Sequence, residues 1–217
     1  GHWYRLPPVE APADAVEQEE RNRDRARLLL DRYGVLFREL LERELPALQW
    51  PRLFRSLRIM ELSGEVVAGQ FFTGIAGLQF ASHAALRRLE QGLAEDRVFW
   101  LNAADPASPC GLGLPALAGL PHRVPGNHFV YCGARLVVTS ERRGRRLTIA
   151  VGADHPDLAR YLSFLKVALT RQERPVKGIV VEEINGDAAA ESAFRAVLAD
   201  LFHVVRDGRS LRLGRRY

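Results

Sequence analysis

Apolar residues recur at helical spacing through the first part of the chain, and this pattern predicts three helices. The expected helices cover about residues 16–33, 36–44 and 51–62. Gly34 follows the first at the position that glycine favours just past a helix end, Pro46 stops the second, and Pro51 opens the third. In the third helix, Leu53 and Met60 fall on one face that should pack inward, as does Leu57.

Strand-like segments at residues 65–72 and 76–81 come next, followed by a short helix at residues 83–91. Three helices and then a hairpin are the order of a winged helix-turn-helix. We therefore expect a winged helix over residues 15–92. Residues 1–14 read as a strand remnant at residues 3–6 and a proline-rich linker, and this abrupt start indicates a piece of a longer protein.

Strand patterns dominate from Arg97 onward, with Gly144, Asn185-Gly186 and Asp207-Gly208 marking turns. The expected strands cover residues 98–101, 128–132, 135–140, 146–151, 177–184, 202–206 and 210–213, and the expected helices cover residues 156–172, capped by Asp154, and 188–201. Residues 93–217 are therefore predicted to form a small β-barrel-like domain with two packed helices. The whole chain is expected to be of the α+β class.

The charge balance favours a polyanionic partner. The formal net charge is +5, and 29 of the 31 basic residues are arginine, because Lys166 and Lys177 are the only lysines. A GC-rich genome is a sufficient reason for the excess of arginine over lysine. The two cysteines are too few for a disulfide scaffold and suit a reducing cytoplasm. No apolar run approaches the roughly 20 residues of a membrane span.

Four groups of side chains are candidates for nucleic-acid contact. Arg52, Arg55 and Arg58 recur every three residues on the third helix, where guanidinium forks could bind phosphate; the alternative is a solvated face paired with Glu61 or Glu65. The other candidates are Gln70 and Phe72 of the wing, Arg142, Arg143, Arg145 and Arg146 at one hairpin tip, and Arg209 and Arg212 in the basic tail. If strand alternation puts Phe71 and Phe72 on opposite faces, one of them could stack on a base.

Catalytic and cofactor chemistry is not indicated. The acidic residues Asp105, Asp154 and Asp207 suit turns or a helix cap, and at least one of Glu182 and Glu183 should face solvent. His122 and His128 have no metal-ligand spacing. Because no phosphate-binding Gly-Lys-Ser/Thr motif is present, this chain is not expected to hydrolyse ATP itself, and we assign it no catalytic residue, metal or cofactor.

Seven segments in a fixed order carry a family resemblance: LDRYGVLF (30–37), LRIMELSGEV (57–66), GQF (69–71), GLQFA (77–81), LNAADP (101–106), VEEING (181–186) and DGRSLRL (207–213). Their order and spacing resemble the C-terminal region of Lhr-type (long helicase-related) ATP-dependent helicases, from about residue 27 onward. The resemblance implies winged helices followed by a β-barrel, an arrangement similar to AlkZ-type DNA glycosylases. Those enzymes carry a catalytic glutamine motif in an earlier winged helix, which Gly77-Leu78-Gln79 echoes only superficially.

The resemblance therefore implies an accessory part of a DNA-repair helicase that binds single- or double-stranded DNA and works with upstream motor domains. Two alternatives stay open. The chain could be part of a DNA glycosylase acting on damaged bases, or a homo-oligomerisation module that uses the helix at residues 156–172.

Overall fold

The computed structural model describes residues 12, 14–92, 94–173 and 175–216, and the chain divides into two compact units between Gln91 and Gly92. The strand expected at residues 3–6 lies outside the described residues. The two units are treated separately below.

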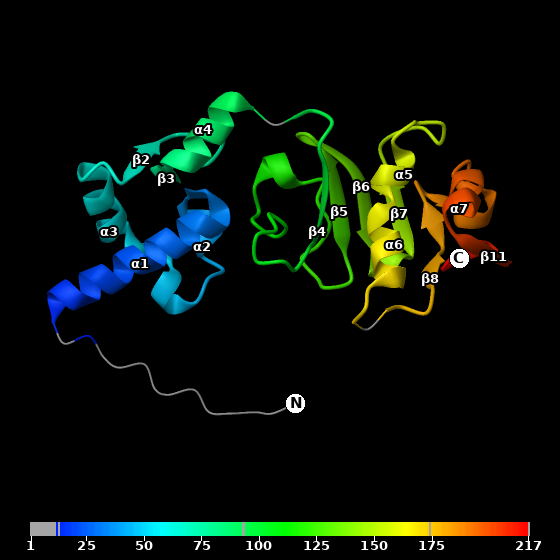
Figure 1. Ribbon diagram of the computed structural model, residues 1–217, viewed down its shortest axis with the longest axis horizontal. Helices are drawn as coiled ribbons and strands as arrows, with labels where there is room; N and C mark the ends of the chain where they lie inside the picture. Colours follow the sequence, from blue (N-terminus) through cyan, green and yellow to red (C-terminus); the bar gives the residue numbers. More distant parts are fainter. Residues whose placement is uncertain (1–11, 13, 93, 174, 217) are drawn as a thin grey trace. The chain divides into compact units, whose positions relative to one another are not determined.

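The first unit has the elements of a winged helix (Figure 1). They are α1 (Ala15–Tyr33), β1 (Val35–Leu36), α2 (Arg38–Leu41), the 3₁₀ turn η1 (Pro46–Leu48), α3 (Trp50–Leu62), β2 (Val66–Gly69), β3 (Gln79–Ser82) and α4 (His83–Gln91). The strands form an antiparallel sheet in the order β1-β3-β2. Helix α1 packs on α3, and the largest fully buried side chains lie on the three helices α1, α2 and α3 and on the adjoining strands: Leu29, Leu36, Leu41, Leu53, Leu57, Met60 and Phe80.

Local signals set the ends of α1. The Asp14 carboxylate accepts hydrogen bonds from the N–H groups of Val16 and Glu17, both at 2.9 Å, and so caps the helix. Gly34 adopts a φ of +75° and its N–H donates to the Leu30 carbonyl oxygen at 2.8 Å. The predicted closing glycine is therefore confirmed.

The second helix is shorter than predicted, because residues 35–36 form a strand. Val35 pairs with Ala81 and Leu36 with Phe80, which adds β1 to the wing sheet. The left-handed Gly34 releases the chain into an extended conformation that lasts until Phe37. Two buried residues next to a turn suit a strand as well as a helix, so the apolar spacing alone was misleading here.

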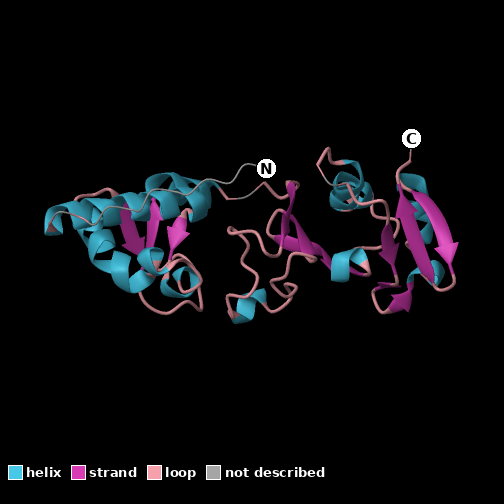
Figure 2. Cartoon of the chain, turned by 90° about the horizontal axis from the view of Figure 1, so that it is seen from below, coloured by secondary structure: helices cyan, strands magenta, loops and turns pink. Residues whose placement is uncertain are grey.

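The second unit is built on two open sheets (Figure 2). Its strands are β4 (Val98–Asn102), β5 (His128–Cys132), β6 (Arg135–Glu141), β7 (Arg146–Ile149), β8 (Ile179–Val181), β9 (Glu183–Ile184), β10 (Asp187–Ala188), β11 (His203–Asp207) and β12 (Ser210–Gly214). Its helices are α5 (Leu158–Tyr161), α6 (Ser163–Thr170) and α7 (Arg195–Leu201), with the 3₁₀ turns η2 (Pro115–Leu117), η3 (Arg142–Gly144) and η4 (Ala189–Glu191).

The larger sheet has the order β10-β9-β7-β6-β5-β4, and the smaller has the order β11-β12-β8. Among the described residues the larger sheet ends in two edges, β10 and β4, so the expected barrel-like closure is not confirmed. Strands β8 and β9 are consecutive parts of one segment that leaves the smaller sheet for the larger one at Glu182. The segment 179–184 therefore links the two sheets, with residues 179–181 paired in the smaller sheet and residues 183–184 in the larger.

The predicted bounds of both helices in this unit are wrong in part. The helix expected at residues 156–172 breaks at Leu162 into α5 and α6, and it begins after Asp157 instead of after Asp154. The helix expected at residues 188–201 exists only as α7. The N–H of Ala189 donates to the Glu182 carbonyl oxygen and that of Ala190 to the Arg209 carbonyl oxygen, so tertiary hydrogen bonds override the helical tendency of the alanines.

Candidate nucleic-acid interface

Helix α3 presents two exposed arginines that form no ion pair within the described part of the chain. Leu53, Leu57 and Met60 are buried on the opposite face, as predicted. Arg52 and Arg55 are exposed, and neither guanidinium has a carboxylate partner among the residues that the structure describes. Arg58 differs, because it is only partly exposed and is bonded to Glu61 on the same helix. Two of the three predicted cations are therefore open to a ligand.

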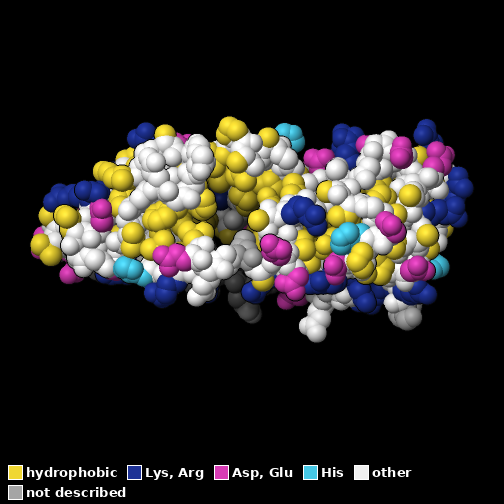
Figure 3. Space-filling view, turned by 90° about the horizontal axis from the view of Figure 1, so that it is seen from above, with side chains coloured by type: hydrophobic (Ala, Val, Ile, Leu, Met, Phe, Trp, Pro, Cys, Tyr) yellow, Lys and Arg dark blue, Asp and Glu magenta, His cyan; other side chains and the backbone are white. Residues whose placement is uncertain are grey.

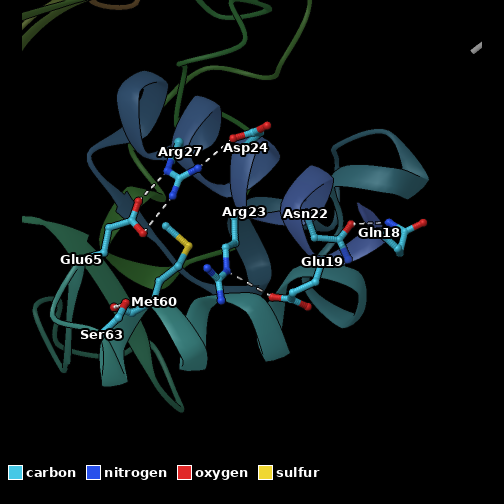
Figure 4. A network of polar contacts seen from close by, with 9 residues as sticks. All are labelled: Gln18, Glu19, Asn22, Arg23, Asp24, Arg27, Met60, Ser63 and Glu65. Carbon is cyan, nitrogen blue, oxygen red and sulfur yellow. Dashed lines mark hydrogen bonds and ion pairs between the residues drawn. The ribbon is translucent and has the colours of Figure 1, made fainter. Parts of the chain in front are cut away.

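Glu65 is held by α1 and does not neutralise α3 (Figure 4). Its carboxylate accepts from Arg27 Nε at 2.6 Å and from Arg27 Nη2 at 3.1 Å, while Arg27 Nη1 donates to Asp24 at 2.8 Å. The hydrogen bond to Glu65, followed by the one to Asp24, raises the pKa of Arg27 above its ordinary value. This network joins α1 to the start of β2 and leaves Arg52 and Arg55 outside it.

Aromatic rings fix the first turns of α3. Trp50 lies 5.5 Å from Phe54 and 5.8 Å from Phe80 between ring centroids, and Phe54 lies 6.1 Å from Phe80. Trp50 and Phe80 are buried, whereas Phe54 stays 37% exposed beside Arg55. The backbone that carries Arg52 and Arg55 is therefore anchored by the core.

The wing carries no charge. Residues 66–82 contain no acidic or basic side chain, so the wing offers no cation to a phosphate. Gln70 is exposed, and Phe72 is 39% exposed while its ring makes an edge contact with Phe37 at 6.1 Å. The wing could offer a ring face and an amide to a base or a sugar.

Gln79 organises the tip of the wing. Its Oε1 accepts from the N–H groups of Phe71 at 3.0 Å and Phe72 at 2.9 Å, and its Nε2 donates to the carbonyl oxygens of Phe72 at 3.1 Å and Ile75 at 3.4 Å. Strand β2 ends at Gly69, so the alternation predicted for Phe71 and Phe72 does not apply. Gln79 is 0% exposed and its amide is fully used, which leaves it a structural role.

The hairpin tip of the second unit divides its four arginines into two pairs. Arg145 bonds to Glu182 at 2.6 Å, and Arg146 bonds to Glu183 at 3.2 Å. Arg142 and Arg143 are exposed, and within residues 94–173 and 175–216 no carboxylate pairs with either. Their φ values are +52° and +62°, a conformation that costs roughly 1–2 kcal/mol for a residue other than glycine.

The basic tail is largely occupied by structural contacts. Arg209 and Arg212 are exposed, with Arg212 between the buried Leu211 and Leu213 on β12. Arg215 donates to the carbonyl oxygen of Thr170, the last residue of α6, and Arg216 donates to that of Ala199 near the end of α7. Cations at these positions stabilise the carboxyl ends of helices.

Basic side chains do not form one continuous stripe on the face shown in Figure 3. Within each unit, small groups of lysine and arginine alternate with acidic side chains. Of the predicted arginine contacts, six are exposed and have no carboxylate partner among the described residues: Arg52, Arg55, Arg142, Arg143, Arg209 and Arg212.

The aspartate residues considered as candidates for catalysis lie in or beside turns. The Asp105 carboxylate accepts from the Ala107 N–H at 2.8 Å, which forms a turn, and Asp207 ends β11 at its hairpin. No group of three or more histidine, cysteine or acidic residues that could hold a metal ion occurs among the described residues. No helix in this described part is long and apolar enough to cross a membrane.

His128 lies among aromatic rings and should make stability depend on pH. Burial, and then the charge of Arg171, lower the pKa of its imidazole. Because the unfolded chain takes up the proton first, the free energy of unfolding should fall as the pH falls below about 6.5. We expect His128→Leu to show less of this loss when denaturant unfolding is compared at about pH 7.5 and about pH 5.5. The control is His203→Leu, which changes a histidine at an exposed site. If the free energy of unfolding fell equally with pH in the parent and in both variants, the prediction would be contradicted.

Comparison with known proteins places these features in one family. A family model described as the winged-helix domain of the large helicase-related protein matches residues 15–99. The chain is 33% identical over 214 residues to a Mycolicibacterium smegmatis protein named Lhr helicase/probable uracil glycosylase, an alignment that covers 92% of this chain and 14% of that protein. It is 28% identical over 184 residues to the Escherichia coli Lhr helicase/uracil glycosylase, covering 80% of this chain and 12% of that protein. The chain thus spans a small part of the curated relatives it matches.

Proposed function

Because this chain belongs to the Lhr-type (large helicase-related) family and corresponds to its C-terminal region, we propose that it binds DNA as an accessory part of such a helicase. The relatives' names supply the helicase context. In this proposal the ATP-driven motor lies in other domains of the full protein, and this region guides DNA during repair.

One observation carries the proposal: the third helix of the winged helix exposes Arg52 and Arg55, and neither forms an ion pair with any described residue. In helix-turn-helix proteins the corresponding helix enters the major groove or lies against the backbone. Unpaired guanidinium groups bind phosphate by two parallel hydrogen bonds and stay charged. Helix α3 is therefore the primary DNA contact of the first unit.

The uncharged wing supplies a different kind of contact. Phe72 has an exposed ring and Gln70 an exposed amide, which suit a base or a sugar better than a phosphate. Stacking of a base on an aromatic ring contributes about 1–3 kcal/mol. Because Gln79 fixes the loop, these groups need little further ordering on binding.

Charge reversal on α3 tests the proposal. We expect Arg52→Glu/Arg55→Glu to weaken binding of labelled single- or double-stranded oligonucleotides at least about tenfold, because each lost phosphate contact forfeits roughly 1.5 kcal/mol or more. The slope of log K against log salt should flatten by about 1.8, or 0.9 for each phosphate contact on duplex DNA. Fluorescence anisotropy over a salt series measures both quantities.

The matched control is Arg87→Glu/Arg88→Glu, which makes the same charge change at exposed positions of α4. It should bind nearly as the parent does. Equal affinity and salt slope for the α3 variant and the parent, on both kinds of DNA, would remove α3 from the interface.

The names of the relatives favour a second candidate function, in which this chain forms part of a DNA glycosylase that acts on uracil. The residues of this chain support a role in binding DNA within such an enzyme. The one glutamine that echoes a glycosylase motif, Gln79, is enclosed and fully hydrogen bonded. In this second proposal the reacting groups come from elsewhere in the full protein.

A further inference from the structure

The η3 turn of the second unit is unusual in its residue types. Arg142, Arg143 and Gly144 all have left-handed backbone conformations, with φ values of +52°, +62° and +90°. Only one other described residue that is not glycine, Asn185, has a positive φ. Glycine or asparagine adopts this conformation at lower cost than arginine, so the backbone does not explain why arginine occupies both positions.

Hydrogen bonds from a neighbouring loop hold the turn in place. The Arg142 N–H donates to Asn127 Oδ1 at 3.0 Å, and the Arg143 N–H donates to the Gly126 carbonyl oxygen at 2.9 Å. Asn127 is only 4% exposed, and its Nδ2 donates to the His122 carbonyl oxygen at 3.0 Å. The turn is therefore fixed by a buried side chain that is itself anchored.

The stem of Arg143 is also positioned. A Cβ atom at Gly126 would lie 3.0 Å from Arg143 Cγ, so the side chain rests directly on the glycine backbone. The guanidinium groups of Arg142 and Arg143 have no carboxylate partner in the described part of the chain, whereas those of Arg145 and Arg146 do. The turn thus displays two adjacent cations that no described carboxylate neutralises, on a backbone held by hydrogen bonds.

We propose that Arg142 and Arg143 form a preorganised binding site for the phosphate groups of a nucleic-acid strand, with Asn127 as its positioning residue. The inference rests on the proposed function, since it assumes that the chain binds nucleic acid, and it adds a second contact in the second unit. A turn whose backbone is already held by hydrogen bonds loses less freedom on binding than an unanchored loop does. Such a site recognises the sugar–phosphate backbone and not the base sequence.

The variant Arg142→Asn/Arg143→Asn separates strain from binding, because asparagine tolerates the left-handed conformation and carries no charge. We expect its thermal stability to equal or exceed that of the parent, while affinity for a labelled oligonucleotide falls roughly tenfold and the salt slope flattens by about 1.8. The control Arg145→Gln/Arg146→Gln removes the same charge from the same hairpin, where both arginines are already paired. It should bind nearly as tightly as the parent.

Asn127→Ala tests the positioning role. It should weaken binding, and adding it to Arg142→Asn/Arg143→Asn should cause little further loss, because residues that act together are not additive. If the losses of binding free energy caused by Asn127→Ala and by Arg142→Asn/Arg143→Asn were fully additive, Asn127 would have no positioning role in the site.

The outcomes also separate this inference from the proposed function. Parental affinity of Arg142→Asn/Arg143→Asn, alongside weak binding by Arg52→Glu/Arg55→Glu, would overturn the second-unit site alone. Parental affinity of both variants would overturn both proposed contacts, α3 and the η3 turn, whereas failure of the parent chain to bind DNA would overturn the proposed function itself. A loss of stability that accompanies the loss of affinity in Arg142→Asn/Arg143→Asn would show that the turn serves the fold, and it would also overturn the site.

Discussion

Replacing Gln79 by leucine should lower the free energy of unfolding of the winged helix by about 2–4 kcal/mol. The substitution leaves the N–H groups of Phe71 and Phe72 and the carbonyl oxygen of Ile75 without the partner that they have in the wing. Each unsatisfied group that remains buried costs roughly 1–3 kcal/mol, and partial opening of the loop to water limits the total. Denaturant unfolding measures the change when it is followed by the fluorescence of the buried Trp50, with Trp3 and Trp100 replaced by phenylalanine.

Gln70→Leu is the matched control, because it makes the same substitution at an exposed position of the same wing. Its effect should stay within about 0.5 kcal/mol. If Gln79→Leu were equally mild, the hydrogen bonds that we describe would not hold the wing together.

Gly144→Ala is expected to destabilise the second unit by about 2–5 kcal/mol. A left-handed alanine costs roughly 1–2 kcal/mol, and overpacking adds about 1–3 kcal/mol. The overpacking arises because the new Cβ atom would lie 2.6 Å from Ile179 Cγ2. Thermal or denaturant unfolding of the full chain reports this loss.

Gly208→Ala separates the two contributions to that loss. Gly208 has a φ of +60°, but a Cβ atom there would meet nothing within 4 Å. This control should therefore show the cost of backbone conformation without the contact. Equal losses for the two variants would mean that Ile179 moves aside freely.

Sequence signals predicted those helices whose ends are set locally. Gly34 ends α1 and Pro51 occupies the first turn of α3, so these ends could be read from residue type alone, whereas the cap that Asp14 forms was not predicted. The failures occur where distant backbone groups compete. Residues 35–36 join β3, and Ala189 and Ala190 bond to Glu182 and Arg209, contacts that no local pattern contains.

The sequence predicts which arginines are candidates for phosphate contact, but it does not predict which of them form ion pairs with carboxylates. Arg145 and Arg146 meet their carboxylates 37 residues along the chain, and Arg27 meets Glu65 after 38 residues. Which arginine is neutralised is therefore decided by strand register and by helix packing. Parallel pairing of β7 with β9 places Arg146 opposite Glu183, which a single sequence does not reveal.

The sharing of residues 179–184 between two sheets has a consequence for synthesis. Strand β7 emerges from the ribosome well before β9, and until then its outer edge has no partner in the order of the sheet. An unpaired edge invites association with other nascent chains. Since β8 also needs β12, the smaller sheet closes only when residues 210–214 have been made. The second unit therefore cannot complete its folding until residues 210–214 have emerged from the ribosome.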